Sequence, residues 1–308
     1  MNMLIAIPFN QIFSHKPMLA TLDCVLCLIR QSLSAARFAT KDVSIHTAIL
    51  KQTLDVIREK GFPVVTPLLA QEIHHIVQKE TGITDPYVVQ KQEANSIMLG
   101  IMDSLRDQIR QSSDPLLFAI KVAIAGNSID YVISSDWNQD LLLHTFEQAT
   151  QQPINGDIER FVEVIKNAKQ IMYLLDNCGE IVCDQLLIEE IKRLRPDLPV
   201  IGVVHGSAVL NDVTREDARQ TGFDEAVSTI DNGNDAIGTI LEQCGAEFME
   251  AFGKSDTIIV KGMANYETLI EYNSEQLPQT VCYLFRAKCP IIAKHVGAAT
   301  NDLIVRVK

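Results

Sequence analysis

The stretch Ile171-Met-Tyr-Leu-Leu-Asp176-Asn177-Cys-Gly179-Glu180-Ile-Val decides the fold of this chain. Its first five residues predict a short buried strand, and the residues from Glu180 onward predict the helix that follows. An acid–amide pair lies between them, followed by a glycine that allows a tight turn into the helix. Ligands of an open α/β sheet bind just beyond the carboxyl ends of its strands. The stretch therefore predicts an α/β fold with a binding site at Asp176 and Asn177.

The residue types at this strand end indicate the chemistry. Asp176 and Asn177 offer hard oxygen ligands for a cation such as Mg²⁺ or Mn²⁺. The N-terminus of the following helix is a ready site for an anion such as phosphate. A cation site beside an anion site indicates chemistry on a phosphate group. The alternative is that the Asp-Asn pair only caps the helix.

Four further strands are predicted, each followed by polar or charged residues. They are expected over residues 198–204, 225–230, 256–260 and 280–285. Helical patterns separate most of them, for example over 213–220 and 235–252, so a mainly parallel sheet is expected. Because the carboxyl ends of parallel strands meet at one edge, their acids, amides and lysines should share one cleft. Capping explains any one of these residues but not the whole set.

The first half of the chain predicts helices and few strands. Apolar residues recur at three- and four-residue spacing over 22–38, 45–60, 68–81, 90–109 and 116–125. A polar, turn-rich segment at 151–156 follows these helices. We therefore predict a mainly helical domain over residues 1–155 and an α/β domain over residues 156–308.

Composition narrows the class of protein. The 308 residues carry a formal net charge of −12, which argues against a nucleic-acid-binding protein. Seven cysteines without a regular framework predict a reducing cytoplasm. The apolar run at residues 4–9 lacks a basic flank and is far shorter than the ~20 apolar residues of a membrane helix. We expect a soluble cytoplasmic protein that binds neither nucleic acid nor membrane.

The segment Leu22-Asp-Cys24-Val-Leu-Cys27 contains a CxxC motif. Such a pair is half of a zinc site, a redox pair, part of an active site, or two small residues packed on a helix. No second pair follows at zinc-finger spacing, and no strand precedes the helix as in thioredoxin. The sequence leaves packing and a metal or active-site role open.

Three other positions also have two interpretations. In Gly126-Asn127-Ser-Ile-Asp130, Gly126 is a helix C-cap and Asn127 a turn residue, unless the helical domain folds over the sheet edge. Asp212 opens a predicted helix as a cap, or it is a third oxygen ligand beside Asp176. Glu180 is a cap or a group that supports the site.

Several segments carry a resemblance to a known family. They are Asp176-Asn177-Cys-Gly179-Glu180, Val209-Leu-Asn211-Asp212 with Asp217-Ala218, residues 255–267, and Ala287-Lys288-Cys289. These segments are similar to motifs of the domain-of-unknown-function 89 family. Its members are metal-dependent damage-control phosphatases, also called acidic-residue-methyltransferase-like proteins. The CxxC opening, which continues to Arg30, and the Gly126–Asp130 segment resemble its smaller, mainly prokaryotic branch.

The resemblance implies a fold, an activity and a set of site residues. It implies a helical N-terminal domain packed on a Rossmann-like α/β/α sandwich, and hydrolysis of small phosphomonoesters with Mn²⁺, Co²⁺, Ni²⁺ or Mg²⁺. The implied metal ligands are Asp176, Asn177 and Asp212, which with Lys288 form the expected catalytic set. The expected contacts to a small phosphorylated metabolite are Gly262, Asn265, Tyr266, Asn127, Asp130 and Arg30. Two departures, Cys178 in the first motif and Met263-Ala264 in the substrate loop, leave the preferred substrate open.

Two other function classes compete with a phosphatase. One is a carboxyl methyltransferase that uses S-adenosylmethionine, which would usually show a glycine-rich turn after the first strand. This chain has a single glycine there, Gly179, together with acids suited to a metal. The other is a non-catalytic metal- or nucleotide-binding module. Phosphatase assays with and without Mn²⁺ distinguish all three.

Overall fold

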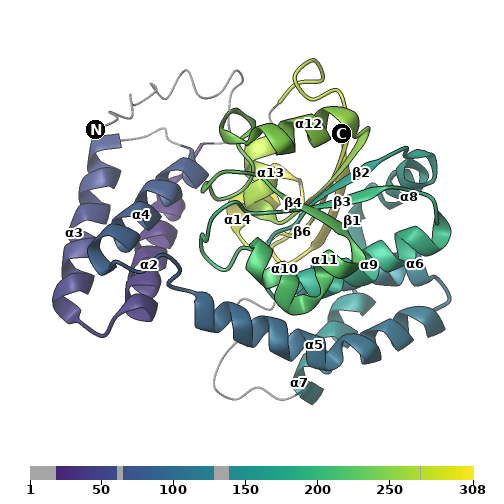
Figure 1. Cartoon of the computed structure of the whole chain (residues 1–308), viewed down its shortest axis with the longest axis horizontal. Coiled ribbons are helices and arrows are strands. Elements are labelled where there is room, and N and C mark those ends of the chain that lie inside the picture. Colours follow the sequence, from purple (N-terminus) through teal and green to yellow (C-terminus); the bar gives the residue numbers. More distant parts are fainter. Residues whose placement is uncertain (1–18, 61–64, 128–138, 271) are drawn as a thin grey trace.

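A computed structural model describes residues 19–60, 65–127, 139–270 and 272–308. The chain forms a seven-stranded sheet covered by helices, with a separate three-helix group beside it (Figure 1). That group consists of α2 (Leu22–Ala39), α3 (Val43–Lys60) and α4 (Thr66–Thr81). Within the described ranges, no helix is both long and apolar enough to cross a lipid bilayer.

The sheet has the strand order β1-β7-β6-β5-β2-β3-β4. Its strands are β1 (Ile154–Gly156), β2 (Ile171–Leu174), β3 (Val200–Val204), β4 (Ser228–Asp231), β5 (Thr257–Lys261), β6 (Thr280–Arg286) and β7 (Leu303–Val307). All neighbours pair in parallel except β6 and β7. The predicted α/β fold with a mainly parallel sheet is confirmed, and the sequence prediction missed β1 and β7.

Helices cover both faces of the sheet. One face packs against α5 (Val88–Gln111), α6 (Pro115–Gly126), α7 (Gln139–Gln151), α8 (Ile158–Asn167), α9 (Glu180–Leu194), α10 (Arg215–Thr221) and α11 (Phe223–Ala226). The other packs against α12 (Ala246–Lys254), α13 (Met263–Leu269) and α14 (Pro290–His295). This arrangement is an α/β/α sandwich.

Strand β2 shows why the residues pack in this way. Ile171 and Tyr173 belong to the core on the α9 side, whereas Met172 and Leu174 belong to the core on the α12 side. A strand buried on both faces is apolar throughout, which explains the continuous run in the sequence. Leu174 is in register with Val203 of β3 and Val260 of β5, so the three strands end nearly level. Residues that follow these strands therefore meet at one edge.

One predicted helix, over residues 235–252, is wrong in its first half. After β4 the chain forms turns and a single 3₁₀ turn, η2 (Leu241–Gln243), before α12 begins at Ala246. Asn232 and Asn234 accept backbone hydrogen bonds from Gly206 and Ala236, and these bonds stabilise turns rather than a helix. Gly238 has a φ of +81° and lies against the backbone of Ala264.

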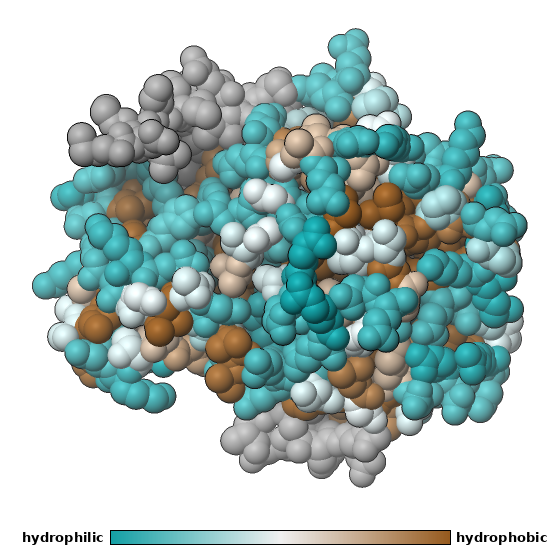
Figure 2. All heavy atoms as spheres, viewed as in Figure 1, coloured by the Kyte–Doolittle hydropathy of each residue, from teal (hydrophilic) through white to brown (hydrophobic). Residues whose placement is uncertain are grey.

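The surface is rich in polar side chains. The face drawn in Figure 2 is mainly hydrophilic, and apolar side chains are interspersed among polar ones. The three-helix group makes its apolar contact with the sandwich through Leu28, Leu69 and Ile73, which pack with Val209 and Ile237. It therefore lies beside the loops that follow β3 and β4.

Candidate active site

Asp176, Asn177 and Asp212 lie together at the carboxyl edge of the sheet. Asn177 and Asp212 form an isolated antiparallel bridge, and the backbone N–H of Val213 donates to the carbonyl of Asp176 at 2.9 Å. The three side chains are buried, with 7%, 6% and 4% of their surface exposed. The structure thus brings together the three predicted ligands, although their role in binding a cation stays a prediction. Helix α10 begins only at Arg215, with Thr214 as its N-cap, so Asp212 is not the cap of this helix.

Gly262 forms one wall of this site. Its φ is +81°, and a Cβ atom on Gly262 would lie 2.1 Å from Cγ of Asp176. A side chain at this position would therefore occupy the same space as the Asp176 carboxylate. This close backbone approach explains why a glycine precedes α13.

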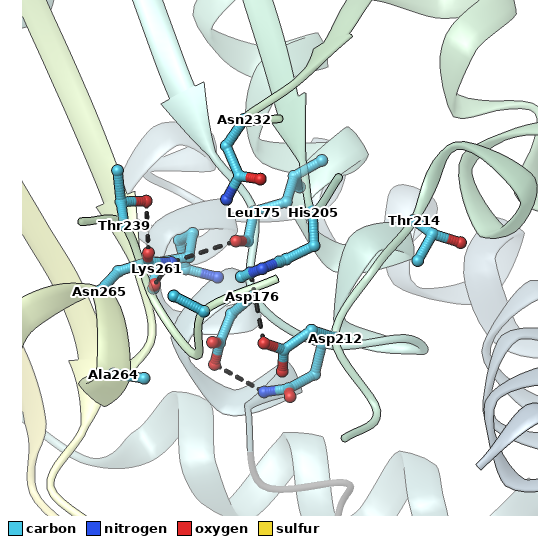
Figure 3. Close-up of polar contacts among 12 residues, drawn as sticks. Leu175, Asp176, His205, Asp212, Thr214, Asn232, Thr239, Lys261, Ala264 and Asn265 are labelled. Carbon is cyan, nitrogen blue, oxygen red and sulfur yellow. Dashed lines mark hydrogen bonds and ion pairs between the residues drawn. The ribbon is translucent and has the colours of Figure 1, made fainter. Parts of the chain in front are cut away.

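Asn265 and Tyr266 have partners inside the protein. Asn265 donates through Nδ2 to the carbonyls of Leu175 and Lys261, at 3.2 and 2.9 Å, and accepts from Thr239 (Figure 3). Asn265 therefore fixes α13 to the ends of β2 and β5. The Tyr266 hydroxyl lies 2.8 Å from Nδ1 of His295. Contact of either side chain with a substrate stays a prediction.

His205 is a site residue that the sequence indicated only as a strand end. It follows β3, and its Nε2 lies 3.3 Å from Oδ2 of Asp212 (Figure 3). Burial and, to a smaller extent, the charge of Lys91 together lower the pKa of His205 to about 4. The imidazole is therefore neutral at pH 7, when its Nε2–H can donate to Asp212 and orient that carboxylate.

Asn127 reaches the site from the end of α6. Its Nδ2 donates to Oδ2 of Asp176 at 2.7 Å and to Oε2 of Glu180 at 2.6 Å. Its Oδ1 is buried and has no hydrogen-bond partner among the described residues. An unsatisfied buried acceptor costs about 1–3 kcal/mol. The oxygen is therefore a contact that a ligand can complete.

Gly126 is the last residue of α6, not a left-handed C-cap. A Cβ on Gly126 would lie 3.0 Å from Sγ of Cys183 in α9. The glycine therefore lets α6 and α9 pack closely, and this packing brings Asn127 to the site. The interpretation of Gly126 as a C-cap was wrong.

A fully buried ion cluster lies beneath these residues. Nζ of Lys261 contacts Glu180 at 2.6 Å and Asp184 at 2.5 Å, and it donates to the carbonyl of Ala123. The Tyr173 hydroxyl donates to Asp184. Burial raises the pKa of Asp184 to about 7, and the charge of Lys261 opposes part of this rise. Burial lowers the pKa of Lys261, but Asp184 and Glu180 outweigh that effect and raise it overall.

Helix α5 contacts the segments around the site through Asn95 and Lys91. Asn95 accepts a hydrogen bond from the backbone N–H of Gly179 at 2.7 Å, which stabilises the turn between β2 and α9. Lys91 forms ion pairs with Asp217 at 2.7 Å and with Asp85 at 3.1 Å. Asp217 also forms the capping box of α10 with Thr214. Lys91 and Asn95 had no recognisable signal in the sequence, because their contacts with the site depend on how helix α5 packs against α9 and α10.

Of the remaining predicted residues, Lys288 and Arg30 belong to segments that the structure describes. The backbone N–H of Lys288 donates to Sδ of Met263 at 3.3 Å, which places Lys288 beside the start of α13. Arg30 is exposed on α2. Asp130 lies outside the described residues.

The cysteines of α2 lie where this helix meets the sandwich. Cys24 packs in the same apolar cluster as Ala264 of α13. Burial raises the pKa of Cys27, and Glu267 is close enough to raise it further. Burial also raises the pKa of Cys289, and Glu267 and Cys24 add smaller contributions. The CxxC motif therefore faces α13 and the start of α14.

The donor set at the strand ends suits a hard divalent cation. Within the ranges described above, no three His, Cys, Asp or Glu side chains cluster so as to hold a metal ion. The set at Asp176 and Asp212 is of another kind, because it combines two carboxylates with the amide of Asn177. Carboxylate and amide oxygens are ligands of Mg²⁺ and Mn²⁺. The buried, partnerless oxygen of Asn127 beside them agrees with a cation or another electron-poor ligand at this position.

Fold and site together define a Rossmann-like α/β/α protein with carboxylate and amide side chains at its topological switch, where ligands of such folds bind. The model of the family described as "Damage-control phosphatase ARMT1-like domain" matches residues 20–304. The chain belongs to this family, as the motif resemblance implied.

Individual relatives agree over nearly the whole length. An uncharacterized protein of Methanocaldococcus jannaschii is 34% identical over 294 residues, which cover 92% of this chain and 93% of that protein. A damage-control phosphatase of Archaeoglobus fulgidus is 32% identical over 292 residues, covering 92% and 97%. The crystal structure of a DUF89 family protein from Pyrococcus horikoshii superposes with a TM-score of 0.84 at 27% identity, covering 93% of this chain and 98% of that one.

Proposed function

We propose that this protein is a metal-dependent phosphatase that hydrolyses small phosphomonoesters such as sugar phosphates or damaged phosphometabolites. The observation that carries the proposal is the convergence of Asp176, Asn177 and Asp212 beside the N-terminus of α9. Membership of the damage-control phosphatase family supports it. The proposal is also supported by two relatives, from Archaeoglobus and Pyrococcus, which are named damage-control phosphatases.

The proposed cofactor is a divalent cation, Mn²⁺, Co²⁺, Ni²⁺ or Mg²⁺. Asp176, Asn177 and Asp212 would hold it, and when bound it supplies Lewis-acid stabilisation of charge on the phosphoryl group. His205 keeps the Asp212 carboxylate oriented through the 3.3 Å contact. Because residue 262 is a glycine, its backbone lies directly against the Asp176 carboxylate. These residues make a rigid, largely buried site, which favours positioning and electrostatic stabilisation of phosphoryl transfer.

The proposed substrate contacts surround this centre. Lys288 would hold a phosphoryl oxygen as a point charge. The Gly262–Tyr266 segment, Asp130 and Arg30 would contact the rest of a small phosphorylated metabolite. Asn127, which donates to Asp176, would contact both this metabolite and the cation. We place the enzyme in the cytoplasm, without a nucleic-acid or membrane partner, and all seven of its cysteines are free thiols, as a reducing compartment requires.

A colorimetric phosphatase screen tests the proposal. Chelated protein is assayed against a panel of sugar phosphates and other phosphomonoesters, with and without added Mn²⁺. We expect phosphate release only with the cation and none from Asp212→Asn protein. If the protein instead methylates carboxylates from S-adenosylmethionine, or releases no phosphate under any condition, the proposal is wrong.

A further inference from the structure

Two buried amides share the same pair of carboxylate acceptors. Nδ2 of Asn127 donates to Oδ2 of Asp176 and to Oε2 of Glu180, at 2.7 and 2.6 Å. Nδ2 of Asn177 donates to the same two oxygens, at 2.6 and 3.2 Å. The two amides come from the end of α6 and the end of β2, so Glu180 and Asp176 connect segments that are far apart in sequence.

This sharing determines which way each amide faces. The NH₂ group of each amide has two hydrogens, and both are directed at carboxylates. The reverse orientation would place a carbonyl oxygen against two negatively charged oxygens and leave the NH₂ group without them. The carbonyl oxygens of Asn127 and Asn177 are therefore turned away from Glu180. For Asn127 this leaves a buried Oδ1 with no hydrogen-bond partner.

Glu180 is itself held from the opposite side. Its Oε1 contacts Nζ of Lys261 at 2.6 Å, and both side chains have no exposed surface. Lys261 also donates to the carbonyl of Ala123, one helical turn before Asn127 in α6. A buried carboxylate needs such a charged partner. Lys261 therefore holds Glu180 in place and fixes the distance between α6 and α9.

We infer that Glu180, held by Lys261, is a positioning residue that turns the amide carbonyls of Asn127 and Asn177 toward the bound cation. It touches neither cation nor substrate and acts through the two amides and Asp176. Removal of a group that orients metal ligands typically costs about 10- to 100-fold in metal affinity. The inference rests on the proposed cation site.

The competing interpretation is that the cluster only stabilises the fold. Asp184 separates the two interpretations, because it contacts Lys261 at 2.5 Å and is as deeply buried as Glu180. Its described hydrogen bonds are to Lys261 and Tyr173 and do not include Asn127 or Asn177. Asp184→Asn is therefore a control matched to Glu180→Gln in burial, charge change and ionic partner.

The experiment measures Mn²⁺ binding to chelated protein by isothermal titration calorimetry without substrate, together with thermal unfolding of the same samples. We expect Glu180→Gln to weaken Mn²⁺ binding roughly 10- to 100-fold. Asp184→Asn should lower the unfolding temperature and leave the Mn²⁺ affinity close to that of wild type. If Glu180→Gln does not fold, Asn127→Ala is measured instead, and it should also weaken Mn²⁺ binding.

The outcomes separate this inference from the proposed function. Equal Mn²⁺ affinity in wild type and Glu180→Gln, or equal losses in Glu180→Gln and Asp184→Asn, would overturn the positioning role while phosphatase activity persists. Unchanged affinity in Asn127→Ala would do the same. Wild-type protein that binds no divalent cation would overturn both the inference and the proposed metal dependence.

Discussion

The backbone of Gly262 lies directly against the carboxylate of Asp176, and a Cβ atom at position 262 would come within 2.1 Å of Oδ2. Gly262 lies between β5 and α13 as the N-cap of α13, whereas Asp176 follows β2. The contact therefore holds the start of α13 against the proposed ligand. The Asp176 carboxylate can therefore keep this position only because residue 262 is a glycine in this backbone conformation.

Gly262→Ala should damage both stability and activity. A non-glycine residue with a strained backbone conformation costs on the order of 1–3 kcal/mol, and the methyl group would also displace Asp176. We expect a lower midpoint of urea unfolding and loss of most phosphatase activity. Gly253→Ala is the control, because a Cβ there meets nothing within 4 Å. Equal activities of the two variants would show that Asp176 does not need its observed position.

Asp212→Asn should abolish metal-dependent turnover and leave the circular dichroism spectrum intact. The change keeps the shape of the side chain and removes the charge that a divalent cation requires. Wild-type activity should vanish on chelation and return with Mn²⁺, Co²⁺, Ni²⁺ or Mg²⁺. Asp224→Asn, at an exposed position, should behave as wild type. Full activity in thoroughly chelated protein would contradict the metal site.

Lys288→Met should lower kcat/KM without weakening cation binding. Charge-assisted hydrogen bonds contribute about 1.5–3 kcal/mol, and each 1.36 kcal/mol is a factor of ten in rate. We therefore expect a loss of roughly one to two orders of magnitude in kcat/KM. Lys294→Met, on the exposed side of α14, is the control. Steady-state kinetics like those of wild type would remove Lys288 from the mechanism.

Cys24 and Cys27 should be reduced thiols that do not form a closed zinc site. Cys24 accepts a hydrogen bond from the backbone of Thr21 in the capping box of α2, a role that a neutral thiol can fill. Thiol titration of protein purified with reductant should find both groups free, and elemental analysis should find no stoichiometric zinc. Zinc that persists in wild type and disappears in Cys24→Ser would disprove this prediction.

His74 should make the protein less stable in mild acid. Burial and, to a smaller extent, the neighbouring His75 together lower the pKa of His74 to about 4, whereas the unfolded value is near 6.5. The unfolded chain binds the proton more readily, so the contribution is complete above pH 6.5 and is lost as the pH falls toward 4. Between pH 7 and pH 5 the loss is on the order of 2 kcal/mol.

His74→Phe tests the contribution of His74 to the pH dependence of stability, because it removes the titrating group and keeps an aromatic ring near Tyr87. Urea unfolding at pH 7 and pH 5 should show a smaller drop in unfolding free energy for the variant. The same drop in both proteins would mean that His74 does not titrate in this range.

Much of the fold follows from local patterns in the sequence. Strands β2, β3, β5 and β6 are apolar runs with most of their residues buried, and such runs are recognisable without knowledge of their partners. Strand β4 is more polar and only partly buried. Strand β1 has only three residues, and it pairs with β7, which comes much later in the sequence. Neither strand has a local signal strong enough to reveal that pairing. The division of the chain at residue 155 stays a prediction.

The candidate site was predictable in part. Asp176, Asn177 and Asp212 follow strands directly, so sheet topology alone places them near each other. Lys261 is the last residue of β5, so sheet topology also places it at this edge. Its ion pairs with Glu180 and Asp184 could not be predicted, because they depend on how α9 packs against β5. His205 and Lys91 were not predicted as site residues, because their roles depend on loop and helix positions that have no sequence signature.

Strand β2 lies between β3, which follows it after one helix, and β5, which is made much later in translation. While the ribosome is still producing the segment before Thr257, β2 can pair with β3 but has no partner on its other side. Its Ile-Met-Tyr-Leu edge is then apolar and open, and unpaired edges of this kind promote aggregation of nascent chains. Strand β2, an interior strand of the finished sheet, thus has one open edge during synthesis, and overproduction at low temperature or with added chaperones should raise the soluble yield.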